Sequence, residues 1–358
     1  MKILFNGTIF YKQKYGGISR YFYNLGNELI KKKVDFKIAT PFYKNLYLKE
    51  LNKNYKTGLY IKHFPDLKFI DELQSKFNNY YISKLKPNII HETYYSNKIK
   101  KRDSLKIITV YDLIHEKFPD FYFKYNKKLF LEDVDFFICI SETTKKDLME
   151  IYNIPKDKIK VIYLGGDHIV SYTEKVKYDL INKPCILYVG SRIKYKNFET
   201  LIKAYSNSSI LQKDYNIVCF GGGIFSKKEK ILFEELKVSK NIINFQGNDS
   251  LLFNLYKESK CFISTSLYEG FGIPIIEAMH CKSPVFLSDC DTHKEIAKEN
   301  AIYFEKQNYE SLMNELENNL YNEDKLKKLN EKANLYVKSF NWENCAEKTL
   351  DLYKMLSG

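Results

Sequence analysis

The feature of this sequence that most constrains its fold is the alternation of short apolar runs with longer segments of helical periodicity. Short apolar runs bounded by polar residues are typical of buried strands. Runs of this kind occur in the first half of the chain at 3–5, 36–39, 88–90, 106–110, 136–140 and 160–162. Helices are predicted at 18–30 and at 142–151, where Ser141 is well placed as an N-cap.

A polar, charged stretch at 171–183 interrupts this pattern, and the apolar run at 185–189 starts a second series of strands and helices. Alternating strands and helices form parallel sheets with right-handed crossovers. The sequence therefore predicts an α/β protein with two doubly wound, Rossmann-like domains and a cleft between them. A length of 358 residues agrees, since it exceeds what one core usually supports.

Composition narrows the class of protein. The chain has no run of about 18 apolar residues, and its start reads as a first strand rather than a signal peptide. Its seven cysteines show no metal-ligand or disulfide spacing, and most lie in apolar runs. We therefore expect reduced core thiols, a cytoplasmic protein and no metal site.

The positive charge is concentrated in the first half. Residues 1–180 hold 33 of the 57 Lys and Arg and 21 of the 44 Asp and Glu, which is +12 of the net +13. Such a surface could meet nucleic acid, anionic lipid or an acidic glycan, or carry solvated lysines with no partner. Because no nucleic-acid motif accompanies it, we expect no nucleic-acid partner.

The segment 266–279 carries the chemistry. It follows an apolar run at 261–264 and leads into a predicted helix with Pro274 in its first turn. Its glycines allow backbone N–H groups to approach a ligand at the helix start, which suits a diphosphate. Glu269 and Glu277 bracket the loop, and carboxylates accept the paired hydroxyl donors of a sugar or ribose.

The string E-G-F-G-I-P-I-I-E-A-M at 269–279 resembles the signature of the retaining glycosyltransferases of family four, which have the GT-B fold. The resemblance implies that Glu269 lies near the transferred sugar and that Glu277 binds the donor ribose. It places Gly270, Phe271, Gly272 and Ile273 in the donor-binding loop.

Two further segments resemble parts of the same family. Gly16 and Gly17 open a predicted helix after the first strand and would line the cleft. Arg192 and Lys196 follow the strand at 185–189, and in the family an Arg and a Lys at this spacing neutralise the donor diphosphate.

The segments 88–95 and 109–119 resemble a subgroup that builds bacterial surface polysaccharides, including mannosyltransferases. Many members carry a His-Asp pair in the second segment, where this chain has Tyr111 and Asp112. A tyrosine donates a hydrogen bond but does not titrate near neutrality. His91, Tyr111, Asp112 and His115 are the candidates for sugar binding and catalysis on this side, and the alternative for each histidine is a structural hydrogen bond.

The resemblance implies an acceptor-side domain at 1–175, a nucleotide-sugar domain at 176–340 and a last helix at 341–358 that crosses back to the first domain. It further implies a retaining hexosyltransferase that needs no metal or other cofactor. The donor would be GDP-mannose or a UDP-sugar, and the acceptor a glycan or a lipid-linked saccharide. The basic half predicts a peripheral position on an anionic membrane face. The alternatives are a catalytically silent GT-B protein that binds a nucleotide sugar or glycan, and a basic membrane- or nucleic-acid-associated protein.

Overall fold

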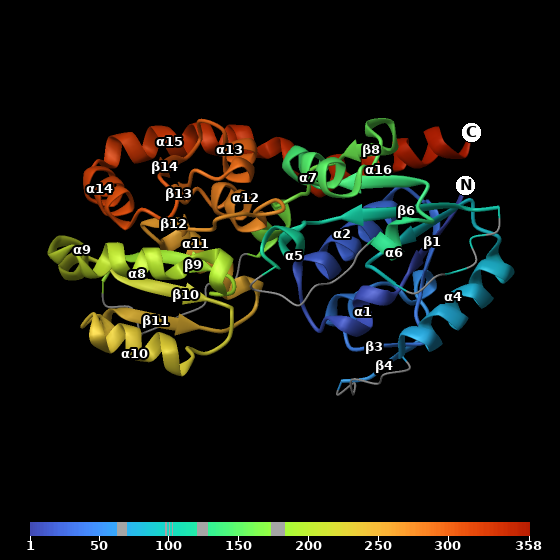
Figure 1. Cartoon of the computed structure of the whole chain (residues 1–358), viewed down its shortest axis with the longest axis horizontal. Coiled ribbons are helices and arrows are strands. Elements are labelled where there is room, and N and C mark those ends of the chain that lie inside the picture. The colour runs from blue at the N-terminus through green and yellow to red at the C-terminus, as the bar shows by residue number, and fades with distance from the viewer. Residues whose placement is uncertain (63–69, 97–98, 100, 102, 120–127, 173–182) are drawn as a thin grey trace. The chain divides into compact units, whose positions relative to one another are not determined.

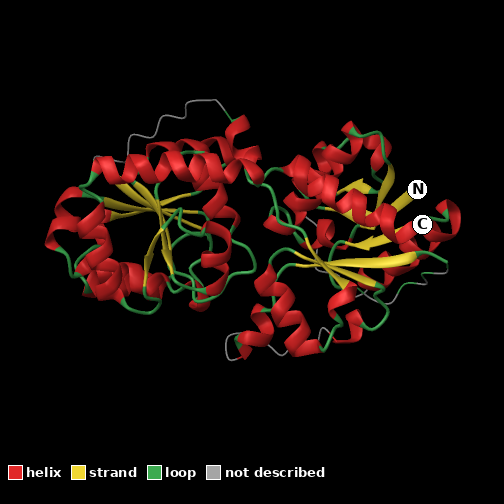
Figure 2. Cartoon of the chain, turned by 90° about the horizontal axis from the view of Figure 1, so that it is seen from above, coloured by secondary structure: helices red, strands yellow, loops and turns green. Residues whose placement is uncertain are grey.

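The computed structural model describes residues 1–62, 70–96, 99, 101, 103–119, 128–172 and 183–358. It divides into two compact units. Unit 1 comprises Met1–Leu164 together with Trp342–Gly358, and unit 2 comprises Gly165–Asn341. The domain boundary expected near 175 lies outside the described residues. Figures 1 and 2 show a central sheet covered by helices on both faces in each unit.

Over the described residues, unit 1 has a parallel sheet of six strands in the order β2-β1-β5-β6-β7-β8. Their bounds are β1 Lys2–Asn6, β2 Asp35–Ala39, β5 Ile89–Glu92, β6 Leu105–Val110, β7 Phe136–Cys139 and β8 Ile159–Val161. The six predicted strands are confirmed to within two residues at each end. Two very short strands, β3 (Phe42–Tyr43) and β4 (Leu59–Tyr60), form a separate parallel pair that the sequence pattern did not predict.

The helices of unit 1 cover this sheet. They are α1 Thr8–Lys12, α2 Gly17–Lys31, α3 Leu46–Glu50, α4 Ile70–Leu85, α5 Ile114–Lys117, α6 Lys128–Leu131, α7 Glu142–Tyr152 and α16 Trp342–Ser357. In α2 the predicted apolar face is buried at Phe22, Leu25 and Leu29, whereas Ile18 is only half-buried. The predicted cap of α7 is confirmed, because the Ser141 hydroxyl accepts a hydrogen bond from the Thr144 amide.

Unit 2 repeats the architecture with the strand order β11-β10-β9-β12-β13-β14 over its described residues. The strands are β9 Cys185–Val189, β10 Asn216–Phe220, β11 Ile242–Phe245, β12 Cys261–Ser264, β13 Val285–Ser288 and β14 Ile302–Phe304. Counted within the unit, this is the order 3-2-1-4-5-6 of a doubly wound dinucleotide-type sheet.

The helices of unit 2 are α8 Phe198–Ser206, α9 Ser209–Asp214, α10 Lys227–Glu235, α11 Asp249–Glu258, α12 Ile273–His280, α13 Asp291–Ala297, α14 Tyr309–Asn319 and α15 Glu323–Tyr336. Its core is built from the inward side chains of β9, β10 and β12 against α8 and α14, with Leu201, Tyr205 and Leu312 among the fully buried residues. All seven cysteines of the chain are buried free thiols, as expected from their place in apolar runs.

Candidate functional site

The strand order of unit 2 fixes where a ligand site is expected. The chain winds one way from β9 to β10 and β11, and the other way from β12 to β13 and β14. β9 and β12 are hydrogen-bonded neighbours, so the loops at their carboxyl ends diverge and leave a crevice at this edge of the sheet. Lys196 lies in the segment after β9 and Glu269 in the segment after β12.

These two side chains meet as an ion pair. The Lys196 Nζ lies 2.6 Å from Glu269 Oε1, and the side chains are 20% and 12% exposed. The Ser266 hydroxyl donates to the same Glu269 oxygen at 2.6 Å, and the Thr292 hydroxyl donates to the Glu269 carbonyl oxygen at 2.6 Å. A cation and a carboxylate are thus held together by short contacts from three different segments.

The balance of interactions keeps Glu269 ionised. Burial alone would raise its pKa, but Lys196, His293 and the two hydrogen bonds from Lys196 and Ser266 outweigh this and leave the pKa below its usual range. The site therefore presents a negative charge beside a positive one at neutral pH.

The loop that follows Glu269 leads directly into α12. Gly272 is its N-cap with φ of 92°, a left-handed conformation that favours glycine, and Pro274 lies in the first turn as predicted. Gly270 and Phe271 are buried and Ile273 is half-buried. The amide end of this helix and the Lys196–Glu269 pair thus belong to one loop system.

Glu277 lies one turn into α12, as predicted, but it is buried and already engaged. Its Oε2 accepts a hydrogen bond from the Tyr256 hydroxyl at 3.1 Å, and its Oε1 lies 3.1 Å from His168 Nε2. No local sequence pattern indicated these partners, because His168 and Tyr256 come from distant segments.

Arg192 occupies a different environment from that of Lys196. Its Nε donates to Glu229 at 2.5 Å, and its terminal nitrogens donate to the carbonyl oxygens of Gly221, Gly223 and Ile224 at 3.0 to 3.2 Å. The Arg192 side chain is 4% exposed. Lys196 and Arg192 thus do not form a symmetric pair, and the prediction that both neutralise a diphosphate remains a prediction.

The Gly221–Gly223 run after β10 is a part of the site that sequence reasoning missed. All three glycines have φ between 68° and 78°, and a Cβ on Gly222 would come within 2.4 Å of the Gly190 carbonyl oxygen. Three consecutive glycines after an apolar strand were a usable signal.

In unit 1, His91 lies in the core of the sheet. The side chain is fully buried, with Nδ1 2.5 Å from the Tyr353 hydroxyl and Nε2 2.8 Å from the Thr109 hydroxyl. Burial lowers its pKa to about 3, so it is neutral. Because both ring nitrogens have partners inside the core, this geometry favours the structural alternative for His91, and its predicted role in sugar binding stays a prediction.

Tyr111, Asp112 and His115 follow β6, at the carboxyl edge of the unit 1 sheet as predicted. Tyr111 is buried with its ring 5.9 Å from that of Tyr21, and burial raises its pKa well above the usual value. Asp112 accepts a hydrogen bond from the Ile114 amide, and His115 is half-buried on α5. The roles predicted for these three residues remain predictions.

Gly16 and Gly17 begin α2, as the sequence predicted. Gly16 is extended at the N-cap, and its carbonyl oxygen accepts a hydrogen bond from the Ser19 hydroxyl at 3.0 Å. A Cβ at Gly16 would come within 2.3 Å of Gln13 Oε1, so a side chain there would displace Gln13.

A second polar cluster in unit 1 was not singled out from the sequence. Glu92 and Lys106 are both buried, with Oε1 and Nζ 3.5 Å apart, and Ser96 donates to the other Glu92 oxygen. Burial raises the pKa of Glu92 although Lys106 opposes this. The cluster lies beside the β1–β5 neighbours at which the unit 1 strand order reverses.

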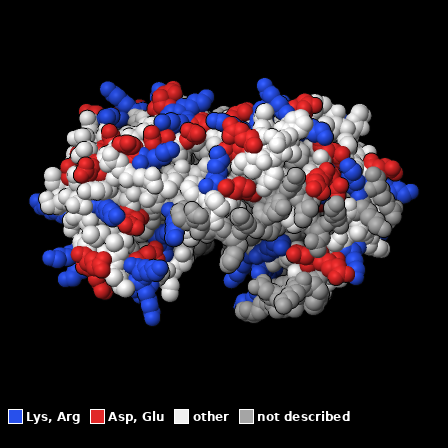
Figure 3. All heavy atoms as spheres, in the orientation of Figure 1, with Lys and Arg blue, Asp and Glu red and all other residues white. Residues whose placement is uncertain are grey.

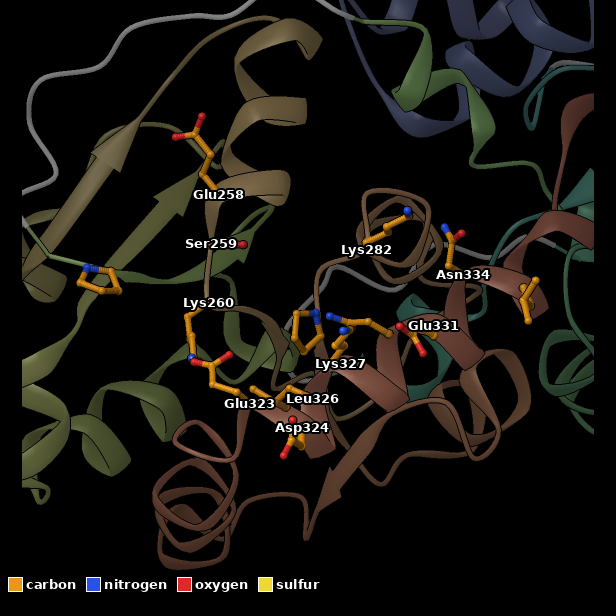
Figure 4. Close-up of a pocket in the computed structure, with 14 residues that line it drawn as sticks. Glu258, Ser259, Lys260, Lys282, Glu323, Asp324, Leu326, Lys327, Glu331 and Asn334 are labelled. Carbon is orange, nitrogen blue, oxygen red and sulfur yellow. The ribbon is translucent and has the colours of Figure 1, made fainter.

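A pocket of about 830 Å³ in unit 2 lies elsewhere. Figure 4 shows its charged lining, including Lys260, Lys282 and Glu331. Pro184, Lys260 and Pro284 precede β9, β12 and β13, so the pocket lies at the amino ends of these strands, opposite Lys196 and Glu269.

No group of three or more His, Cys, Asp or Glu in the described part of the chain is arranged to hold a metal ion. Among those same residues, no helix has the length and apolar character needed to cross a membrane.

Two family models match the sequence and together span most of it. Glycosyltransferase Family 4 matches residues 15–168, and Glycosyl transferases group 1 matches residues 173–336. O-antigen chain mannosyltransferase RfbU of Salmonella typhimurium is 26% identical over 247 residues, 66% of each chain. Uncharacterized glycosyltransferase MJ1607 of Methanocaldococcus jannaschii is 30% identical over 61% of this chain and 59% of its own. These matches thus span about three fifths to two thirds of each relative.

Solved structures share the fold over nearly the whole chain. A glycosyltransferase from Rickettsia africae has a TM-score of 0.75 at 22% identity, covering 99% of this chain and 98% of its own. Anabaena Alr3699/HepE in complex with UDP and glucose has a TM-score of 0.74 at 14% identity, covering 99% and 100%. The predicted two-domain fold is confirmed by these likenesses.

Proposed function

Because the chain belongs to the family-four glycosyltransferases with the GT-B fold, we propose that it transfers a hexose from a nucleotide sugar to a growing bacterial polysaccharide. The observation that carries this proposal is the Lys196–Glu269 pair at the switch point of the unit 2 sheet. Such a crevice is where doubly wound sheets bind nucleotides. The pair supplies a cation for a diphosphate and a carboxylate for sugar hydroxyls.

The proposed roles follow from this chemistry. Lys196 exchanges its contact with Glu269 for one with the departing diphosphate, which stabilises the charge that develops as the glycosidic bond breaks. Glu269 accepts hydrogen bonds from the transferred sugar, and Glu277 accepts them from the donor ribose in place of Tyr256 and His168. The 270–273 loop lets backbone approach the donor. The cleft-lining role of Gly16 and Gly17 stays a prediction.

The donor we propose is GDP-mannose or a UDP-sugar. Mannose is favoured by sequence relatives named O-antigen chain mannosyltransferases, and uridine by structural neighbours described in complex with UDP. Transfer is proposed to retain the anomeric configuration, with the leaving phosphate accepting the proton of the acceptor. No metal is required in this scheme, because Lys196 and the start of α12 face the leaving group.

The acceptor is proposed to be a glycan or a lipid-linked saccharide, with unit 1 on a cytoplasmic anionic membrane face. The net charge of +12 over residues 1–180 supports this. Ion pairs neutralise part of this charge, since Lys32 contacts Glu347 and Lys101 contacts Asp135. Figure 3 shows Lys and Arg interspersed with Asp and Glu on the visible face.

The membrane proposal predicts salt-reversible pelleting of the protein with anionic but not neutral vesicles. An absence of pelleting with either kind of vesicle at low salt removes the proposal.

The test of the activity is a screen of GDP- and UDP-sugars for binding and hydrolysis, with and without chelator. Glu269→Gln should abolish turnover and retain nucleotide affinity, whereas Glu277→Gln should weaken nucleotide binding. Glu310→Gln, at an exposed position of α14, is the matched control and should change neither.

Chelator should leave turnover intact. Loss of turnover in chelator that a divalent ion restores would overturn the metal-independent scheme.

A silent nucleotide-sugar-binding protein is the alternative. It predicts that a donor binds and that no donor in the screen is turned over. Tyr111, at a position where many relatives have a histidine, is the residue that keeps this alternative open.

A further inference from the structure

One buried imidazole of unit 2 has no role in the scheme above. His293 lies on α13 and is fully buried, directly behind the loop that carries Glu269. Nothing in the predicted signature includes it. Its two ring nitrogens face two different strands, and the contacts of each can be assigned separately.

The Nδ1 side fixes the tautomer. The Ser288 hydroxyl donates its only proton to the Ser266 carbonyl oxygen at 2.5 Å, so it has none for the imidazole. The Ser288 carbonyl oxygen, 2.8 Å from Nδ1, can only accept. Nδ1 must therefore carry a proton, and in the neutral ring Nε2 is an acceptor.

The Nε2 side leads to Glu269 through two hydroxyl groups. Nε2 lies 3.3 Å from the Ser264 hydroxyl, which lies 3.4 Å from the Ser266 hydroxyl. Ser266 donates to Glu269 Oε1 at 2.6 Å. The two serines thus form a path between the imidazole and the carboxylate.

The direction of this path depends on the protonation of His293. With a neutral ring, Ser264 points its proton at Nε2, so no hydrogen bond joins Ser264 to Ser266. With a protonated ring, Nε2–H donates to Ser264, Ser264 to Ser266 and Ser266 to Glu269. Only the protonated ring completes a chain of donors that ends on the carboxylate.

Two titratable groups next to the imidazole, Cys290 and Tyr303, are neutral and cannot replace the positive charge of a protonated His293. Cys290 precedes α13, and burial raises its pKa to about 12, so it is neutral. The Tyr303 hydroxyl on β14 donates to the His293 carbonyl oxygen at 3.2 Å, and burial raises its pKa as well. Burial lowers the pKa of His293; the Glu269 charge opposes this and favours protonation, whereas the nearby Lys196 cation disfavours it.

We propose that His293 is a positioning residue for Glu269. The His293 imidazole takes up a proton when a nucleoside diphosphate attracts Lys196. The proton comes from solvent and no covalent bond changes. As Lys196 turns to the phosphates, Glu269 loses its cation, and the imidazolium restores a positive partner through Ser264 and Ser266. Glu269 then keeps its orientation while the donor is bound. This proposal rests on the proposed nucleotide site and adds a residue to it.

Calorimetry of GDP and UDP binding in buffers of different ionisation enthalpy measures the protons taken up per nucleotide. We expect greater uptake in the wild type than in His293→Asn, which keeps a donor for the Ser288 carbonyl but lacks the titrating nitrogen. Titration of the nucleotide phosphate itself is the same in both proteins and cancels in this difference. In the donor assay, His293→Asn should lower kcat about tenfold with KM nearly unchanged, and it should shift the pH profile.

Ser264→Ala separates the relay from local effects of the histidine. It leaves the imidazole in place but removes the hydroxyl link, and should reduce proton uptake as much as His293→Asn does. His280→Asn, at the end of α12 with Nε2 3.2 Å from the Phe340 carbonyl oxygen, is the control and should retain wild-type uptake.

The outcomes distinguish the two proposals. If neither GDP, UDP nor any nucleotide sugar binds the wild type, the proposed function fails. If nucleotide binds but proton uptake is equal in the wild type, His293→Asn and Ser264→Ala, the role of His293 is overturned and the proposed function stands. Because Ser264→Ala is a small change, it keeps the proposal falsifiable even if His293→Asn does not fold.

Discussion

At the scale of single residues, the two predicted phosphate ligands are expected to contribute unequally. The Lys196 ammonium donates to Glu269 Oε1 and lies over the Tyr195 ring, so one charge-assisted contact would be exchanged for a phosphate. Arg192 donates to Glu229 and three carbonyl groups, so turning it to a phosphate would break several hydrogen bonds. The hydrogen bonds that each cation already makes, rather than its charge, decide how readily it can bind a phosphate.

We therefore expect Lys196→Met to weaken GDP or UDP binding by about 1.5–3 kcal/mol, the usual worth of a charge-assisted contact. Arg192→Met should reduce thermal stability more than it reduces nucleotide affinity, because it leaves Glu229 and the glycine loop unsatisfied. Isothermal titration and thermal unfolding of both variants measure this difference. Equal losses of affinity with unchanged stability would show that Arg192 contacts the phosphates as the sequence pattern alone suggested.

The buried His91 makes a second prediction at this scale, for pH dependence. Burial lowers its pKa to about 3, below the ordinary value of 6.5. As pH falls below about 6.5 the unfolded chain binds a proton that the folded chain does not, so this group destabilises the fold by about 1.4 kcal/mol per pH unit. The stability that depends on a neutral His91 is fully present above pH 6.5 and is lost progressively as the pH falls toward 3.

His91→Phe removes this titration. It should be less stable than the wild type at pH 7.5, since it leaves the Tyr353 and Thr109 hydroxyls without their partner. Its unfolding free energy should nevertheless fall less steeply between pH 6.5 and 4.5. Urea unfolding at several pH values measures both slopes, and parallel slopes would contradict the assignment of His91 as a neutral core residue.

At the scale of elements, α12 is packed against both segments that bound unit 2. Gly166, at the start of the unit, donates its amide to the Phe340 carbonyl oxygen at 3.1 Å near the end of the unit. A Cβ at Gly166 would lie 2.6 Å from Ile276 Cγ1, and Ile276 is fully buried in α12. The helix that carries Glu277 is therefore held in place by a glycine far from it in sequence.

Gly166→Ala should destabilise the protein by about 1–3 kcal/mol, the usual cost of overpacking. Its φ of −129° is accessible to alanine, so the cost is steric and not conformational. In an Ile276→Ala background the added methyl has space, and the cost of Gly166→Ala should nearly vanish. The control is Gly26→Ala in α2, whose Cβ would have no neighbour closer than 3.6 Å and should stabilise the helix. Additive effects of the Gly166 and Ile276 changes in denaturant unfolding would contradict this contact.

The elements were predictable from the sequence because their signals are local. Apolar runs gave the strands of the unit 1 sheet, and Ser141 gave the start of α7. Strands β3 and β4, of two residues each, are too short to produce a pattern. The Glu269 loop was predictable from its motif, but the partners of its residues were not. His91 meets Tyr353 across 262 positions, and Arg192 meets Glu229 across 37, which no local pattern reports.

At the scale of the whole molecule, the division into units separates the proposed nucleotide contacts from the last helix. Lys196, Glu269 and Glu277 all belong to unit 2, whereas α16 belongs to unit 1. Buried Trp342, the only tryptophan of the chain, begins α16, and its ring lies 6.1 Å from that of Tyr21. The single indole of the chain therefore belongs to unit 1, apart from the proposed nucleotide contacts.

A nucleoside diphosphate should then stabilise one unit selectively. A ligand at a hundred times its Kd adds about 2.7 kcal/mol to the free energy of the state that binds it. We expect hydrogen exchange with saturating GDP or UDP to slow in β9, β12 and α12, and the amides of β1 and β6 to change little. Lys196→Met at the same nucleotide concentration is the control and should show a smaller effect. Protection should rise most at Ile273 if its amide meets the phosphates, because the N–H of the first residue of a helix has no intrahelical acceptor. Slowing confined to residues 1–164 would place the nucleotide in unit 1 and contradict the site.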